Sequence, residues 1–284
     1  MHGGVRRLIA RLIAGASLEL SPRDPFAGER LGDVLAPGTA VFVDHPADVT
    51  HHEIVAACTR LRRAGFVPVP HVAARHLASF TQASDFLRRA RGEAAVASVL
   101  VTAGDRERPA GPFHDSLDLL ASGVIESHGV GHVLFTGHPA GHPRLGSAVL
   151  DGVLAQKLAL ARERGLDATV IAQCGFEPAP LRRWLARLAA RGLCCPVRIG
   201  VMGPASLATL AVFAVRCGAG AALPALAHRH AALARILTEV TPDALLVALS
   251  AEPLVGPPIA GLHIFCAGGI GRAAAWIAAW RDAA

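Results

Sequence analysis

The sequence has no tyrosine, few aromatic residues and no long apolar run. Aromatic residues make up 5% of its 284 positions. A membrane-spanning helix needs about 18 or more successive apolar residues, so we expect no transmembrane segment. The net charge of +6 comes mostly from arginine, on predicted helix faces such as 60–63 and 181–184. These arginines are not interleaved with aromatic residues and match no nucleic-acid-binding motif. We therefore expect no nucleic-acid partner and only a mild attraction for polyanionic ligands.

The cysteines also lack a pattern, because no two of them have CxxC spacing. Several lie in apolar segments, which is typical of buried thiols. A reducing compartment suits such thiols, so the sequence predicts a cytoplasmic protein. The six cysteines are Cys58, Cys174, Cys194, Cys195, Cys217 and Cys266.

The first residues offer two interpretations. Residues 5–14 combine arginines with apolar residues, as a signal peptide does, but Arg11 interrupts the apolar stretch. An apparent core strand follows almost at once. We therefore predict a short amphipathic helix that closes the bottom of the fold rather than a cleaved leader.

Short apolar segments alternate with helical patterns along the whole chain. The hydrophobic fraction is 52% and the charged fraction 18%, which suits a large buried core. Strands are predicted at 16–20, 39–44, 66–72, 97–102, 130–136, 168–172, 196–200 and 261–266. Helices are predicted at 51–64, 76–91, 114–127, 147–164, 179–191, 205–216, 226–239 and 270–281. Continuous Val-, Ile- and Leu-rich strands are typical of parallel sheets buried on both faces.

This alternation predicts an α/β fold, a single-domain (β/α)8 TIM barrel over residues 1–284 with a short N-terminal helix. We find no internal repeat and no interdomain linker. The stretch 201–260 is irregular and contains Pro253, Pro257 and Pro258, which predict a loop.

Three polar side chains lie at the carboxyl ends of predicted strands, in distant parts of the chain. They are Glu19, Asp105 and Gln173. The carboxyl ends of barrel strands meet on one face, where the active sites of this fold lie. We therefore expect an enzyme with a small-molecule pocket.

Each of these residues has a chemical and a structural interpretation. A carboxylate in a barrel mouth loses solvation, which would raise the pKa of Glu19 and suit a general acid; alternatively Glu19 pairs with an arginine. Asp105 follows Gly104, which allows close approach of a flat ring; alternatively Asp105 closes an Asx turn. Gln173 can both donate to and accept from a heterocycle edge; alternatively its partner is neighbouring backbone.

Fourteen histidines raise the question of a metal site. His138 and His142 are four residues apart, but proline and glycine between them exclude the helical spacing of a zinc pair. His51-His52 and His228-x-His230 are expected on the surface. We predict no metal site. His71 and His138 end predicted strands and are candidates to hydrogen-bond an anionic cofactor.

The segment after the last predicted strand imitates a dinucleotide-binding fingerprint. It has the spacing Gly269-x-Gly271-x-x-Ala274. No second βαβ half and no acidic residue on a following strand come after it, so a Rossmann interpretation fails. The glycines then predict either an anion site at a helix N-terminus or a tight turn.

Seven pieces of the chain resemble, in order, the methylenetetrahydrofolate reductases, the flavin-dependent (β/α)8 enzymes of one-carbon metabolism. The resemblance covers about residues 16–280. The pieces are Ser-Leu-Glu-Leu-Ser-Pro at 17–22, Pro-His-Val at 70–72, Gly-Asp at 104–105, Gly-His-Pro-Ala-Gly-His-Pro at 137–143, Lys157, Ile-Ala-Gln-Cys-Gly-Phe-Glu at 171–177 and Pro-Val-Arg-Ile-Gly-Val-Met at 196–202.

The resemblance implies roles for these residues. Glu19 is the expected general acid, and Asp105 is expected beside both flavin and pterin. Gln173 and Phe176 are expected to hold the tetrahydrofolate substrate, as are Leu207 and Arg272 at positions where the family has other residues. The expected FAD site is made of His71, Gly104, Asp105, His138, His142 and Lys157.

The implied reaction interconverts 5,10-methylenetetrahydrofolate and 5-methyltetrahydrofolate by hydride transfer through FAD, with NADH or NADPH as the second redox partner. Several positions depart from the family. Ala103 replaces an arginine, His138 replaces a tyrosine, Asp44-His45 replaces Thr-Tyr, and 269–272 replaces an Asn-Arg pair. Two other functions therefore stay open: a folate-binding barrel that transfers a methyl group without redox, and a barrel that binds a partner subunit. A homo-oligomer is also compatible with the sequence.

Overall fold

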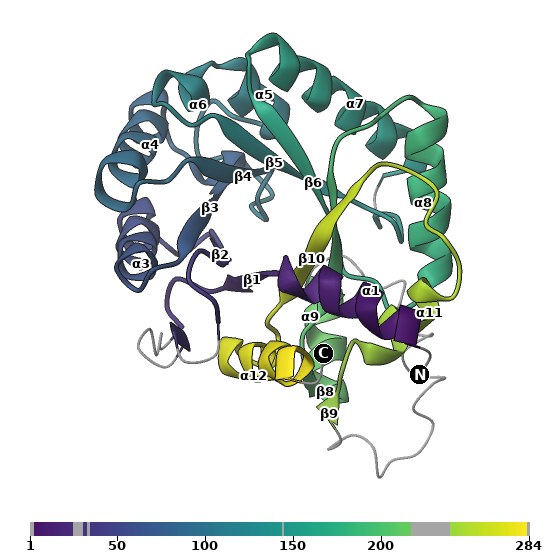
Figure 1. The fold of residues 1–284 in the computed structure, drawn as a ribbon. Coiled ribbons are helices and arrows are strands. Elements are labelled where there is room, and N and C mark those ends of the chain that lie inside the picture. The colour runs from purple at the N-terminus through teal and green to yellow at the C-terminus, as the bar shows by residue number, and fades with distance from the viewer. Residues whose placement is uncertain (1–2, 25–30, 33–34, 144, 217–238, 283–284) are drawn as a thin grey trace. The chain divides into compact units, whose positions relative to one another are not determined.

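The computed structural model describes residues 3–24, 31–32, 35–143, 145–216 and 239–282. Eight strands are hydrogen-bonded in the closed order β1-β10-β7-β6-β5-β4-β3-β2, with helices between them (Figure 1). The predicted (β/α)8 barrel is thus confirmed. The strands are β1 (Ser17–Leu20), β2 (Ala40–Val43), β3 (Val67–Ala73), β4 (Ser98–Thr102), β5 (His132–Gly137), β6 (Asp167–Ala172), β7 (Val197–Met202) and β10 (Ile259–Phe265).

The helices follow the predicted pattern with a few differences. They are α1 (Gly3–Ala14), α3 (His51–Arg63), α4 (Phe80–Ala94), α5 (Ser116–Ala121), α6 (Val124–Ser127), α7 (Ser147–Glu163), α8 (Pro178–Ala190), α9 (Leu207–Arg216), α11 (Asp243–Ser250) and α12 (Ile270–Asp282), with a 3₁₀ turn at Ala74–His76. The predicted helix 114–127 is two helices, because Gly123 takes a left-handed φ of 75° between them. No helix of the described residues is long and apolar enough to cross a membrane.

The stretch 201–260, which was predicted to be irregular, contains the predicted helix 205–216 as α9. Besides α9 and α11 it contains β8 (Ala205–Ser206) and β9 (Glu239–Val240), which form a two-stranded antiparallel sheet. These two-residue strands are too short to show the alternation of apolar and polar residues by which a strand is recognised in a sequence. Most of the helix predicted at 226–239, together with Cys217, His228 and His230, lies outside the described residues.

The contacts of the chain group into two compact units, which are described one at a time. Unit 1 comprises Met1–Leu18, Gly137–Gly152 and Ile171–Ala284, and unit 2 comprises Glu19–Thr136 and Val153–Val170.

In unit 2, strands β2 to β5 pair in parallel register and bury the apolar residues that predicted them. Helix α3 buries Ile54, Val55, Cys58 and Leu61, which lie on one face at helical spacing. The helix begins at Thr50, whose hydroxyl accepts from the Glu53 N–H while the Glu53 carboxylate accepts from the Thr50 N–H. This capping box satisfies two N-terminal donors and fixes where the loop after β2 ends.

In unit 1, β10 and β7 pair in parallel and α1 packs against β10, α11 and α12. A Cβ on Gly200 of β7 would lie 1.9 Å from the carbonyl oxygen of Ala172, so only glycine fits there. The two C-terminal helices are joined by Asp243, whose carboxylate accepts from the indole N–H of Trp276 at 3.2 Å and of Trp280 at 2.7 Å.

Candidate functional site

Two predicted residues of unit 2, Glu19 and His71, lie in contact at the carboxyl ends of β1 and β3. His71 Nε2 is 3.2 Å from Glu19 Oε2, and His71 Nδ1 is 3.2 Å from Asp44 Oδ1. Asp44 directly follows β2, and its N–H donates to the carbonyl of Leu20 at 3.0 Å. Three strand ends thus place one imidazole between two carboxylates.

The three side chains of this cluster differ in exposure. The side chain of His71 is 9% exposed and that of Glu19 is 15% exposed, whereas Asp44 is 45% exposed. His71 Nε2 is buried and not aligned for a hydrogen bond, so its contact with Glu19 is an ion pair. The structure thus places a histidine in contact with Glu19, whereas sequence reasoning offered an arginine as the alternative partner.

The two carboxylates determine the charge of His71. Burial would lower the pKa of His71, but the charge of Glu19 and the hydrogen bond to Asp44 outweigh burial and raise the pKa to about 10. An imidazolium at neutral pH holds a transferable proton next to Glu19. The cluster therefore has the components of a general acid.

The neighbouring His45 has the opposite character. Its Nδ1 accepts from the N–H of Ala73 at 3.2 Å, and its ring lies edge-on to His76 with centroids 5.0 Å apart. Burial, followed by the charges of His76 and His71, lowers the pKa of His45 to about 3. His45 is thus a neutral ring that packs beside the cluster and supports the end of β3.

Asp105, the second predicted catalytic residue, contacts a different histidine. Its Oδ1 is 2.8 Å from His76 Nε2, and the Asp105 side chain is 75% exposed. A Cβ on Gly104 would lie 2.7 Å from the same Nε2, and φ of Gly104 is +86°. Gly104 is therefore required for His76 to reach Asp105. His76 Nδ1 is buried and has no hydrogen-bond partner among the described residues.

Lys157 of α7 is 8% exposed, and its Nζ lies 5.7 Å from the centroid of the Phe135 ring. Burial lowers the pKa of Lys157 to about 8, against a smaller opposite effect of Asp115. The amine is thus covered by the helix–sheet interface rather than presented to solvent.

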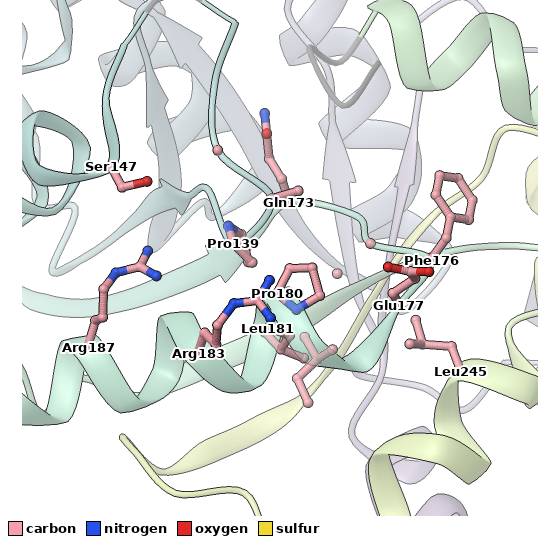
Figure 2. Close-up of a pocket in the computed structure, with 15 residues that line it drawn as sticks. Pro139, Ser147, Gln173, Phe176, Glu177, Pro180, Leu181, Arg183, Arg187 and Leu245 are labelled. Carbon is pink, nitrogen blue, oxygen red and sulfur yellow. The ribbon is translucent and has the colours of Figure 1, made fainter. Parts of the chain in front are cut away.

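Unit 1 contains a cavity of about 320 Å³ that includes two predicted substrate-binding residues, Gln173 and Phe176. Figure 2 shows Gln173 just after β6, with Phe176 and Glu177 in the loop that leads to α8. Apolar and polar groups alternate around this pocket. Its other lining residues are Pro139, Ala140, Gly141, Ser147, Gly175, Pro180, Leu181, Arg183, Arg187, Ile199, Gly200 and Leu245.

The other predicted residues of unit 1 do not line this cavity. His138 and His142 pack edge-on with ring centroids 5.6 Å apart. Leu207 packs with Phe176 against the buried Cys174 and Met202. Arg272 lies in α12 and is 3.8 Å from Glu239. In the glycine-rich segment before it, the N–H of Gly269 donates to the carbonyl of Cys266 at 2.9 Å, which forms a turn at the start of α12.

The predicted flavin residues fit a flavin only in part. His71 is engaged by two carboxylates and Lys157 is covered by Phe135, so neither presents a polar atom outward. Gly104 and Asp105 offer bare backbone and an exposed carboxylate. His138 and His142 are half-buried, and their rings pack against each other.

One group of side chains in unit 2 has ligand atoms close enough for a metal ion: His51, His52 and Asp85. Hydrogen bonds already use these atoms. His51 Nε2 is 3.0 Å from Asp85 Oδ2, Arg88 binds the other carboxylate oxygen at 2.5 Å, and Arg89 contacts His52 Nδ1. Two guanidinium groups at the same place disfavour a cation.

Sequence reasoning missed Asp44, His76, Arg183 and Arg187. Asp44 lies at the carboxyl end of a predicted strand, as Glu19 does, so the same signal was present. His76 lies in a 3₁₀ turn after β3, where no strand-end rule applies. Arg183 and Arg187 belong to an arginine-rich helix face that was interpreted as solvated.

Comparison with known proteins adds little to this description. No protein-family model matches the chain. Among solved structures, the chain is similar to the dihydropteroate synthase of Thermus thermophilus. The identity is 15% and the TM-score 0.47, and the similarity covers 94% of this chain and 92% of that chain.

Proposed function

We propose that this chain is an oxidoreductase of one-carbon metabolism that interconverts 5,10-methylenetetrahydrofolate and 5-methyltetrahydrofolate. The observation that carries the proposal is the contact of Glu19 with His71, an enclosed carboxylate beside a protonated imidazole at strand ends. Opening the methylene bridge of the substrate requires a proton on a ring nitrogen, and this pair supplies a proton donor where the family resemblance places the acid.

The residues of the cluster act in a definite order in this proposal. Glu19 starts as a carboxylate paired with the imidazolium of His71. The Nε2 proton of His71 passes to Glu19, which delivers it to the substrate nitrogen, and the C–N bond electrons remain on that nitrogen as the bridge opens. His71 is then neutral, with its Nδ1 proton held by Asp44. Gln173 hydrogen-bonds to the edge of the pterin that carries both donors and acceptors. Phe176 packs on the apolar face of the pterin.

The proposed cofactor is FAD, which accepts and returns a hydride when bound, with NADH or NADPH as the second redox partner. In unit 2, Gly104 and Asp105 would contribute bare backbone and an exposed carboxylate to its binding.

A second candidate is a folate-binding barrel without redox activity. It is favoured because His71 already contacts two carboxylates and Lys157 already packs over Phe135, within the protein. Ala103 in place of the family's arginine also favours it. In this case Glu19 protonates the folate during methyl transfer.

A visible absorption spectrum distinguishes the two candidates. The proposal predicts an oxidised-flavin band in the purified protein, or after incubation with FAD, that bleaches on addition of 5-methyltetrahydrofolate. A colourless protein that takes up no flavin yet converts folate supports the second candidate. A protein that binds neither flavin nor folate overturns both.

A further inference from the structure

The pocket that contains Gln173 and Phe176 also contains two arginines from one helix. Arg183 and Arg187 are four residues apart on α8 and therefore lie on one face. Figure 2 shows both side chains leaving this face on the side of the loops that carry Pro139 and Ser147.

Arg187 is held in place by a buried carboxylate. Its Nε donates to Asp151 Oδ2 at 3.1 Å, and the Asp151 side chain is only 4% exposed. A guanidinium fixed through Nε keeps its two terminal nitrogens for another acceptor. Arg187 is thus a preorganised donor at one end of the pocket.

Arg183 has no comparable anchor. Among the residues that the structure describes, its guanidinium makes no hydrogen bond and no ion pair, and the residue is exposed. The adjacent Arg182 differs, because it donates to the carbonyls of Ala248, Leu249, Glu252 and Pro253. Arg182 therefore ties α8 to the end of α11, whereas Arg183 is available to a ligand.

The rest of the pocket limits what the ligand can be. Phe176, Leu181, Ile199 and Leu245 provide apolar surface, while Gln173 and Glu177 provide polar side chains with oxygen atoms of the kind that accept hydrogen bonds. Glu177 adds a negative charge, so the pocket does not attract anions in general. A suitable ligand has an apolar or planar body with N–H donors and a separate oxyanion.

We propose that Arg183 and Arg187 bind a carboxylate on the tail of the ligand, which for the tetrahydrofolate of the proposed function is the glutamyl group. This inference rests on the proposed function for the identity of the ligand. Guanidinium groups pair with carboxylates in planar, often bidentate geometry, and two of them on one helix face can grip a tail with more than one carboxylate.

The test compares tetrahydrofolate with tetrahydropteroate, which has the same ring system but lacks the glutamyl group. Binding is measured by calorimetry for the wild type, for Arg183→Gln and for Arg191→Gln. Arg191 lies at the other end of α8, outside the pocket lining, and controls for the change in charge. Arg183 is preferred to Arg187 because removing Arg187 leaves Asp151 buried without its partner.

The wild type should bind tetrahydrofolate roughly tenfold to a hundredfold more tightly than tetrahydropteroate. Arg183→Gln should remove most of this preference by weakening tetrahydrofolate alone, while Arg191→Gln should keep it. Equal binding of the two compounds by the wild type overturns the carboxylate subsite and leaves the proposed function intact. Binding of neither compound overturns both. Inorganic phosphate should not compete; competition that depends on Arg183 would assign the site to phosphate and overturn the carboxylate assignment.

Discussion

His71 Nε2 lies 3.2 Å from Glu19 Oε2, across the ends of two strands that are separated by about fifty residues of chain. Both residues lie near the carboxyl ends of their strands, and both are largely buried. Their contact couples the protonation of one side chain to that of the other.

Replacing Glu19 by glutamine should nearly abolish conversion of folate. Glutamine keeps the shape and hydrogen-bonding capacity but cannot transfer a proton, and general acid catalysis contributes typically ~10²–10⁴-fold. Steady-state turnover should therefore be lost, while folate binding measured by calorimetry should be retained. Asp48→Asn changes an exposed carboxylate paired with Arg23 and should leave turnover near the wild-type value. Wild-type turnover in Glu19→Gln would show that Glu19 is not the acid.

Replacing His71 by glutamine should destabilise the protein in a pH-dependent way. The folded-state pKa of about 10 lies above the ordinary value of 6.5. The stabilisation from the protonated imidazole is therefore fully present below pH 6.5 and is lost as the pH rises through about 10. Urea unfolding across this range should show the difference between wild type and variant shrinking with pH. A constant difference would contradict the ion pair. The exposed His52→Gln serves as the matched histidine control.

Replacing Lys157 by methionine should stabilise the protein at neutral pH, by on the order of 1–3 kcal/mol. The folded-state pKa is lowered from 10.5 to about 8, so below pH 8 the folded protein carries a buried charge. Between pH 8 and 10.5 the wild type loses this charge and gains stability, so the advantage of methionine should shrink. Arg162→Met removes an exposed charge from the same helix and tests whether any charge loss has this effect. An advantage that grows above pH 8 would exclude a buried ammonium.

Sequence reasoning placed every barrel strand because continuous apolar runs report burial on both faces, as at Val99–Leu100–Val101. It also predicted that Glu19, Gln173 and His71 lie near strand ends, as they do in the structure, since the strand-end rule depends only on local pattern. The sequence alone does not show that Glu19 contacts His71, because that contact depends on the register between strands. Nor does it show that Lys157 is covered by Phe135, since a single lysine in a helix has no distinctive local signal for burial.

Replacing Gln173 by leucine should chiefly weaken folate binding. The pterin polar groups would lose their partner while still being buried, which costs about 1–3 kcal/mol. Calorimetry should show weaker binding with little change in thermal stability. Gln156→Leu, at an exposed glutamine of α7, should bind folate as the wild type does. Unchanged binding in Gln173→Leu would remove Gln173 from the substrate site.

Replacing Gly104 by alanine should disturb the contact between His76 and Asp105. The new Cβ would lie 2.7 Å from His76 Nε2, at a φ of +86° that alanine disfavours. We expect a loss of about 1–3 kcal/mol in the free energy of unfolding, measured by urea denaturation. Gly152→Ala on α7 has no atom within 4 Å of the added Cβ and should not destabilise. Tolerance of alanine at position 104 would show that His76 can move aside.

The carboxylate of Asp243 has a consequence for spectroscopy. The protein contains three tryptophans, and two of them, Trp276 and Trp280, donate to this one group. An indole next to a fixed negative charge emits differently from one in solvent. The emission of these two indoles therefore depends on whether α12 stays attached to α11, so a fluorescence-detected melting curve would include the detachment of the C-terminal helix.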